Sequence, residues 1–226
     1  MNELLFFIHV VLVMGFGFIA LKMGKPALIV LIALQAILAN LFVIKQMSLF
    51  GFDVTCSDVF VIGSIFGLNL LREYYGKTVA EKALWICFFA MTFFVVMAQV
   101  HLFYHPSIFD TAHSAFSTIL SSSLRLLAVS LAVFIFVQQI ELRLFGMLKA
   151  KFSALPLSLR NAIAVGMTQF LDTFLFSIFG LWGLVANLFD VILVNYLIKL
   201  LVIALMSPLI HFSKRFSSQE VLKKIQ

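Results

Sequence analysis

The stretch GMTQFLDTFLF, from Gly166 to Phe176, places a carboxylate in the middle of a long apolar segment. Gln169, Asp172 and Thr173 stand at positions i, i+3 and i+4, which puts them on one face of a helix. Polar and charged side chains inside an apolar helix are costly, and they usually face a partner or a cavity. The stretch therefore predicts a buried helix whose polar face looks inward.

The whole chain is too apolar for a soluble domain. Of its 226 residues, 63% are hydrophobic and only 12% are charged, and the mean hydropathy is +1.12. A soluble domain is about half apolar and about a quarter charged, and one core of this size could not bury the excess. We therefore expect an all-α, polytopic helical bundle embedded in a lipid bilayer.

Seven segments are long and apolar enough to cross a bilayer, which takes about 20 helical residues. They cover residues 3–21, 27–44, 54–71, 83–103, 119–140, 161–181 and 185–210. The third begins with GFDVTCSD and contains Gly63 and Gly67, so we expect this helix to be irregular or to start late. The first segment carries Glu3 and no preceding basic residue, which favours a spanning helix over a signal peptide.

Basic residues gather in alternate connections. Thirteen of the 16 Lys and Arg residues fall on one side: Lys22, Lys25, Arg72, Lys77, Lys82, Arg143, Lys149, Lys151, Arg160, Lys214, Arg215, Lys223 and Lys224. The opposite side has only Lys45. This asymmetry predicts an outside N-terminus and a cytoplasmic C-terminus. The net charge of +6 is thus explained by topology, and we expect no nucleic-acid partner.

Polar side chains in the sixth and seventh segments form stripes. Asn195 and Lys199 lie four residues apart, on the same helical face. One interpretation is structural, with Asp172 paired to Lys199 or Arg125 and the amides bonded between helices. The other is a polar ligand, because a carboxylate with nearby amides suits a guanine-like edge of adjacent N–H donors and a carbonyl. Aromatic side chains that could stack on such a ring are Phe170, Phe174, Phe176 and Trp182.

Catalytic and metal-binding motifs are not found. The sequence has no Walker, GxSxG or HExxH pattern, and Cys56 and Cys87 lack a metal-ligand spacing. His101, His105 and His113 are scattered in a predicted outer loop. We therefore expect no enzyme activity, no metal and no cofactor.

Four runs carry a family resemblance: ANLFVIKQMSLFGFDVTCSD (39–58), GLNLLREYYGKTVAEKALW (67–85), GMTQFLDTFLF (166–176) and VNYLIKLL (194–201). They resemble the queuosine precursor transporter family, also called the vitamin uptake transporter family. The resemblance covers residues 27–212. It implies a bacterial inner-membrane importer of 7-deazaguanine bases for tRNA modification, namely 7-cyano-7-deazaguanine, its 7-aminomethyl form or queuine.

The resemblance also assigns roles to individual positions. The implied substrate-binding residues are Asp172, Gln169, Asn40, Asn69, Asn195 and Lys199. Glu73, Asp58 and Asp190 are the candidates for gating or coupling. Relatives often carry an acid in place of Asn69 or Asn195, so proton coupling here would fall to Asp58 or Asp190. Relatives commonly have six spans, which makes residues 1–26 an added helix and loop, 27–212 the transporter core and 213–226 a cytoplasmic tail.

Other readings of the sequence stay open. Small substrate-capturing subunits that need a separate ATPase and scaffold have a similar size and composition. A homodimer is compatible with the sequence, which does not fix the oligomeric state. A membrane enzyme and a purely structural subunit are two further alternatives, but no paired catalytic constellation supports an enzyme.

Overall fold

The computed structural model describes residues 1–213 except 56, 122 and 153–156, and the predicted tail therefore lies almost wholly outside the described residues. The helices are α1 (Asn2–Met23), α2 (Lys25–Phe42), α3 (Asp58–Tyr75), α4 (Lys77–Leu102), α5 (His113–Leu120), α6 (Ser123–Lys151), α7 (Leu157–Phe176) and α8 (Leu188–Ser213). A π-helix, η1 (Ser177–Leu181), follows α7, and two strands, β1 (Gln46–Leu49) and β2 (Phe52–Thr55), separate α2 from α3.

The chain is an all-α membrane protein. Within the described residues, four segments are long and apolar enough to cross a membrane: Asn2–Met23, Lys25–Phe42, Thr78–Leu102 and His113–Phe134, the last of which combines α5 with the start of α6. Large apolar side chains cover their outer surfaces, including Phe89 and Phe93 of α4, which are 74% and 60% exposed. The number of spans, seven, stays a prediction.

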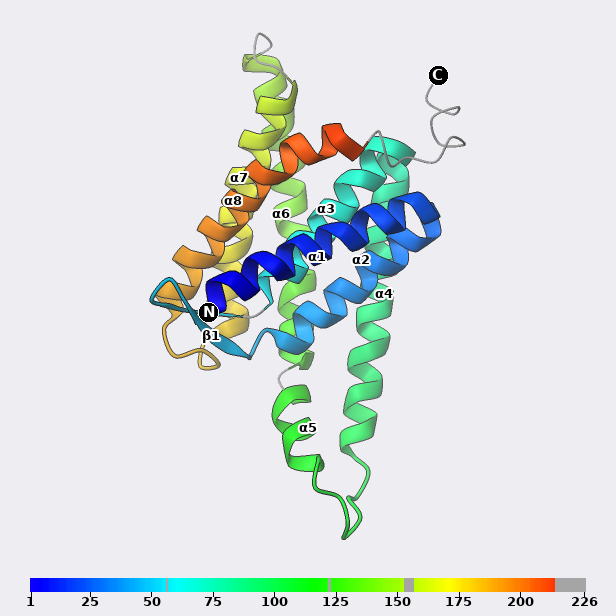
Figure 1. Ribbon diagram of the computed structural model, residues 1–226, viewed down its shortest axis with the longest axis vertical. Helices are drawn as coiled ribbons and strands as arrows, with labels where there is room; N and C mark the ends of the chain where they lie inside the picture. The colour runs from blue at the N-terminus through cyan, green and yellow to red at the C-terminus, as the bar shows by residue number, and fades with distance from the viewer. Residues whose placement is uncertain (56, 122, 153–156, 214–226) are drawn as a thin grey trace.

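The helices pack as a bundle around two close pairs, α2 with α3 and α6 with α7. In Figure 1, α4 and α6 stand upright, α1 crosses in front of α3, and α7 and α8 lie on one side of the bundle. The core between α2 and α3 contains fully buried Leu28, Ile32, Phe66 and Leu70.

Glycines let α3 approach its neighbours closely. A Cβ on Gly63 would lie 2.6 Å from Gln35 Oε1 of α2 and would also clash with Val13 of α1. A Cβ on Gly17 of α1 would lie 2.8 Å from the Phe66 ring. Gly63 therefore serves close helix packing, as small residues do at helix interfaces in membranes.

A β-hairpin occupies the start of the predicted third span. Its strands pair antiparallel from Gln46 opposite Thr55 to Leu49 opposite Phe52, and Phe50 and Gly51 form the turn with φ of 53° and 83°. Two positive φ values in succession are typical of a type I′ hairpin turn. Helix α3 consequently begins at Asp58 rather than at residue 54, in line with the expected late start.

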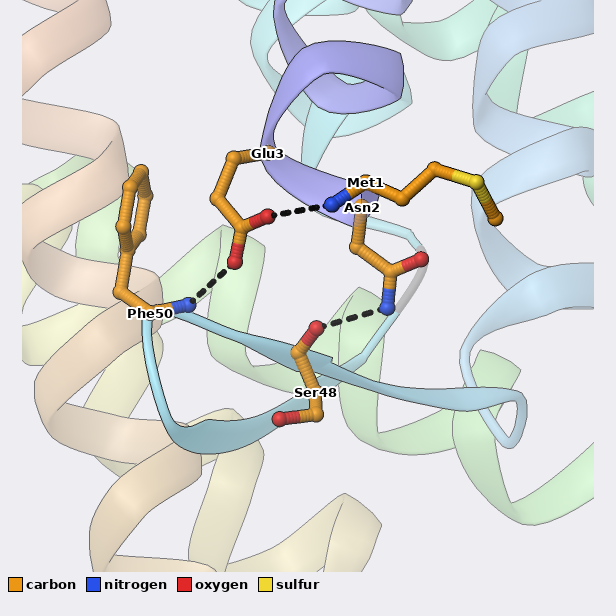
Figure 2. Close-up of polar contacts among 5 residues, drawn as sticks. All are labelled: Met1, Asn2, Glu3, Ser48 and Phe50. Carbon is orange, nitrogen blue, oxygen red and sulfur yellow. Dashed lines mark hydrogen bonds and ion pairs between the residues drawn. The ribbon is translucent and has the colours of Figure 1, made fainter.

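The N-terminus of α1 is bonded to this hairpin (Figure 2). Asn2 Nδ2 donates to the Ser48 carbonyl oxygen over 2.8 Å, and the Phe50 backbone N–H donates to Glu3 Oε1 over 3.2 Å. Strand β2 packs against α8. The hairpin thus links α1 to α8 and leads directly into Asp58, the first residue of α3.

Two other predicted spans are interrupted. The segment 119–140 divides between the end of α5 at Leu120 and the start of α6 at Ser123. The segment 161–181 continues from α7 into η1, where Arg125 of α6 donates to the Phe179 carbonyl oxygen through Nε (3.1 Å) and Nη2 (3.0 Å). Arg125 therefore donates its hydrogen bonds to a backbone carbonyl group and does not pair with Asp172.

Candidate substrate-binding site

A cavity of about 350 Å³ lies among α2, α3, α4, α6, α7, η1 and α8. This is within the range of volumes that small-molecule sites have. Its polar and charged lining consists of Asn40, Thr55, Ser57, Asp58, Ser64, Asn69, Arg72, Glu81, Ser130, Gln169, Asp172, Thr173, Ser177, Asn195 and Lys199. Aliphatic and aromatic side chains complete the wall, so the cavity combines apolar surface with a small number of polar groups.

An ion pair between α7 and α8 forms the charged part of the cavity. Lys199 Nζ donates to Asp172 Oδ2 over 2.9 Å, and the two side chains are 6% and 29% exposed. The lysine is thus enclosed by protein while the carboxylate keeps an accessible side. Because no other hydrogen bond to its carboxylate is found among the described residues, Asp172 Oδ1 is left for a ligand.

A second carboxyl group lies beside the same face of α8. Asp58, which is 5% exposed, has its Oδ2 2.6 Å from the amide end of Asn195. With its nitrogen at that end, Asn195 donates to both Asp58 and the Val191 carbonyl oxygen, the latter over 3.2 Å. We assign this orientation because the oxygen there would face only acceptors. Nearby, the Thr55 and Ser57 hydroxyl groups are hydrogen-bonded over 2.9 Å.

Three polar atoms of cavity-lining residues have no hydrogen-bond partner among the described residues. They are Asn40 Oδ1, Gln169 Oε1 and Thr173 Oγ1. A buried polar atom without a partner costs free energy, and such atoms usually mark a place for water, an ion or a ligand. Gln169 and Thr173 lie on the same face of α7 as Asp172. Gln169 and Thr173 therefore add unused hydrogen-bonding capacity to the helix face that carries Asp172.

The structure brings together most of the residues singled out in the sequence. All six predicted substrate-binding residues line the cavity, and Asp58 does too. Glu73 is exposed at the end of α3, and Asp190 is in the first turn of α8, where a carboxylate is favoured by the helix dipole. Neither of these two acids lines the cavity.

The aromatic part of the prediction needs correction. Phe176 lines the cavity, but Phe170 and Phe174 are 46% and 40% exposed and pack on each other with ring centroids 6.1 Å apart. Trp182 is 65% exposed. None of these three rings lines the cavity: Phe170 and Phe174 lie away from the polar face of α7, and Trp182 follows the end of η1. Instead, Phe88 of α4 and Phe134 of α6, in edge-to-face contact at 4.8 Å, contribute aromatic surface to the cavity.

Several cavity residues were not selected from the sequence. Ser177 follows Thr173 by four residues, so extending the stripe of α7 by one turn would have found it. Arg72 follows Asn69 by three residues, but the sequence analysis assigned it only to a connection on the basic side. Thr55, at the end of the hairpin, and Ser57, just before α3, also line the cavity, and the hairpin that positions them was not predicted from the apolar pattern. In the described part of the chain, no group of three or more His, Cys, Asp or Glu side chains could hold a metal ion.

A helical membrane bundle with a small-molecule cavity, lined by an ion pair and unpartnered amides, is the architecture of a membrane transport protein. The comparisons with known proteins agree. Residues 55–213 match the family model described as "Putative vitamin uptake transporter". The chain is also 31% identical over 213 residues to the "Probable queuosine precursor transporter" of Bacillus subtilis (strain 168), covering 92% of this chain and 91% of that protein. No solved structure matches the chain.

The chain belongs to the vitamin uptake transporter family. It is a transporter of a small molecule and not an enzyme.

Proposed function

We propose that this protein imports queuosine precursors, 7-deazaguanine bases, across the bacterial inner membrane for tRNA modification. The observation that carries the proposal is the Asp172 carboxylate, held by Lys199 on one oxygen and flanked by unpartnered polar atoms of Gln169 and Thr173. The name of the Bacillus subtilis relative supports the choice of substrate class.

The chemistry of the base fits this cavity. A deazaguanine offers a ring N–H and an exocyclic amine side by side, and a carboxylate accepts both donors. Its ring carbonyl needs a donor, and the amide groups of Gln169 and Asn40 can supply one while their oxygens accept from the remaining N–H groups. Asn69 and Asn195 complete the polar lining. Lys199 holds one oxygen of Asp172 and so aligns the carboxylate.

The proposal also includes the membrane topology of the chain and the coupling of transport to protons. The charge asymmetry supports an outside N-terminus, a cytoplasmic C-terminus and a six-helix core preceded by α1. We further propose that transport is coupled to protons. Asp58 is the candidate coupling residue because it is a second, nearly enclosed carboxyl group in the same cavity.

Reconstitution tests the function and its main alternative together. Purified chain in proteoliposomes, given an inward proton gradient and each labelled base in turn, is expected to accumulate one of them without any other protein. Binding without uptake would instead favour a substrate-capturing subunit that needs a separate ATPase. Neither binding nor uptake of any 7-deazaguanine would contradict the proposed function.

A further inference from the structure

The carboxyl groups of Asp58 and Asp172 both line the cavity, and both have the ammonium group of Lys199 as a neighbour. Asp58 and Asp172 stand on α3 and α7, and Lys199 of α8 lies within electrostatic reach of both. The other cavity-lining charges, Arg72 and Glu81, lie near the junction of α3 and α4. Arg72 is 14 residues along α3 from Asp58, which corresponds to about 21 Å. Arg72 is therefore too far away to balance the Asp58 carboxyl group, and Glu81, itself an acid, would not balance it.

The groups that face Asp58 are few and mostly neutral. On α8 they are Asn195, at 2.6 Å, and the more distant Lys199. On the neighbouring helix α1, His9 packs its ring against Phe60, with centroids 4.8 Å apart, and no contact between His9 and the Asp58 carboxyl group is found among the described residues. With Lys199 bonded to Asp172, the carboxyl group of Asp58 has one hydrogen-bond partner among the described residues, Asn195.

Asp58 lies in the first turn of α3, where the helix dipole favours a carboxylate, but an enclosed ionised carboxylate there would still lack a paired cation. Enclosed carboxylates require a paired cation or several donors, and one amide does not meet that need. Two changes would remove the imbalance: a proton on Asp58, or movement of Lys199 from Asp172 to Asp58. Asn195 suits both states, because its amide N–H can donate to an ionised carboxylate or to the carbonyl oxygen of a protonated acid.

We propose that Lys199 is shared between Asp172 and Asp58, and that a proton on Asp58 decides which of the two holds it. With the proton present on Oδ1, Asp58 Oδ2 still accepts from the Asn195 amide, and Lys199 stays on Asp172. Asp172 is then aligned and ready to bind the ligand. When the proton passes from Asp58 to cavity water, the new carboxylate attracts Lys199, and Asp172 loses its partner.

The consequence for transport, which rests on the proposed function, is that proton and ligand bind together and leave together. A proton gradient directed inward would then drive the ligand inward. The sharing of Lys199 itself does not depend on the identity of the ligand, and this allows the two ideas to be tested separately.

A ligand-free double-mutant cycle tests the sharing. Asp58→Asn, Asp172→Asn and the double variant are compared by thermal unfolding of the purified full chain, each with Lys199 and with Lys199→Met. Each single variant leaves Lys199 one carboxylate, whereas the double variant leaves it none. We expect the double variant to lose about 5 °C more than the sum of the singles. The excess should vanish with Lys199→Met, and this background should also rescue a double variant that fails to fold.

Additive losses in the Lys199 background would overturn the proposal, as would an excess that persists with Lys199→Met. Binding of 7-cyano-7-deazaguanine gives a second readout. Wild-type binding is expected to weaken as the pH rises, whereas Asp58→Asn, which mimics the protonated acid, should bind at all pH values but lose gradient-driven accumulation. Equal pH dependence in both proteins would also overturn the proposal. A wild type that binds no 7-deazaguanine would contradict the proposed function, while the unfolding cycle would still report on Lys199.

Discussion

Lys199 Nζ and Asp172 Oδ2 are 2.9 Å apart, and the lysine is almost fully enclosed while the carboxylate remains 29% exposed. The pair is therefore asymmetric: protein surrounds the cation, and the anion borders the cavity. Buried ion pairs contribute little net stability compared with apolar packing, so stability alone is a weak reason for this arrangement. An accessible carboxylate with one fixed oxygen is well suited to a ligand that offers N–H donors.

Replacing Lys199 by an uncharged residue should destabilise the protein, because the Asp172 carboxylate would lose its partner. Breaking a buried pair by deleting one partner costs about 3–5 kcal/mol, and the partial exposure of Asp172 reduces this to about 2 kcal/mol. We expect Lys199→Met to lower the free energy of unfolding by that amount. The double variant Asp172→Asn with Lys199→Met should lose less than Lys199→Met alone. Denaturation of the purified proteins measures both, and a double variant less stable than Lys199→Met would contradict the pairing.

Gln169 offers a test that separates binding from folding. Its Oε1 has no partner among the described residues, so Gln169→Met should leave the thermal stability unchanged or slightly higher. Loss of a ligand hydrogen bond worth about 1 kcal/mol or more should raise the KM for precursor uptake about tenfold. Uptake kinetics in whole cells, normalised to the amount of protein, measure this.

The matched control is Gln35→Met. Gln35 is 4% exposed and its Oε1 also lacks a partner, but it does not line the cavity. We expect a comparable effect on stability and an unchanged KM. Equal KM values for wild type and Gln169→Met would remove Gln169 from the binding site.

Gly63→Ala should destabilise the packing of α3. The added methyl group would meet Gln35 Oε1 at 2.6 Å and clash with Val13, and overpacking of this kind costs about 1–3 kcal/mol. Gly15→Ala is the control, because a Cβ there would meet nothing within 4 Å. Thermal unfolding should show a lower midpoint for Gly63→Ala and an unchanged or higher one for Gly15→Ala. A similar midpoint for both would show that α1, α2 and α3 are not held as closely as the structure indicates.

Much of the fold could be predicted because hydropathy and helix periodicity follow directly from the bilayer and the helical repeat. The face shared by Gln169, Asp172 and Thr173 required only i, i+3 and i+4 spacing, and the cavity lies against that face. The hairpin was missed because β1 and the start of β2 fell in the connection between two predicted spans, while Val54 and Thr55 were included in the predicted third span. Hydropathy reports burial, and Val54 is fully buried, but it does not distinguish a strand from a helix.

Pairing across the bundle could not be derived from spacing. The sequence left Lys199 and Arg125 as equal candidates for Asp172, and only the packing of α7 against α8 favours Lys199. Likewise, the position of Asp58 beside Asn195 depends on the hairpin and on the contact between α3 and α8. Contacts between distant segments are set by tertiary packing, and local periodicity in the sequence carries no information about them.

The central claim is that Asp172 binds the imported base. The most direct measurement is the queuosine content of tRNA in a bacterial host that lacks both queuosine synthesis and its own importer, expresses this chain and receives each precursor at low concentration. We predict that one precursor restores queuosine with the wild type, and that Asp172→Ala, present in the membrane at the same level, abolishes it. Full restoration by Asp172→Ala would contradict the binding role of Asp172, and no restoration by the wild type with any precursor would contradict self-sufficient import.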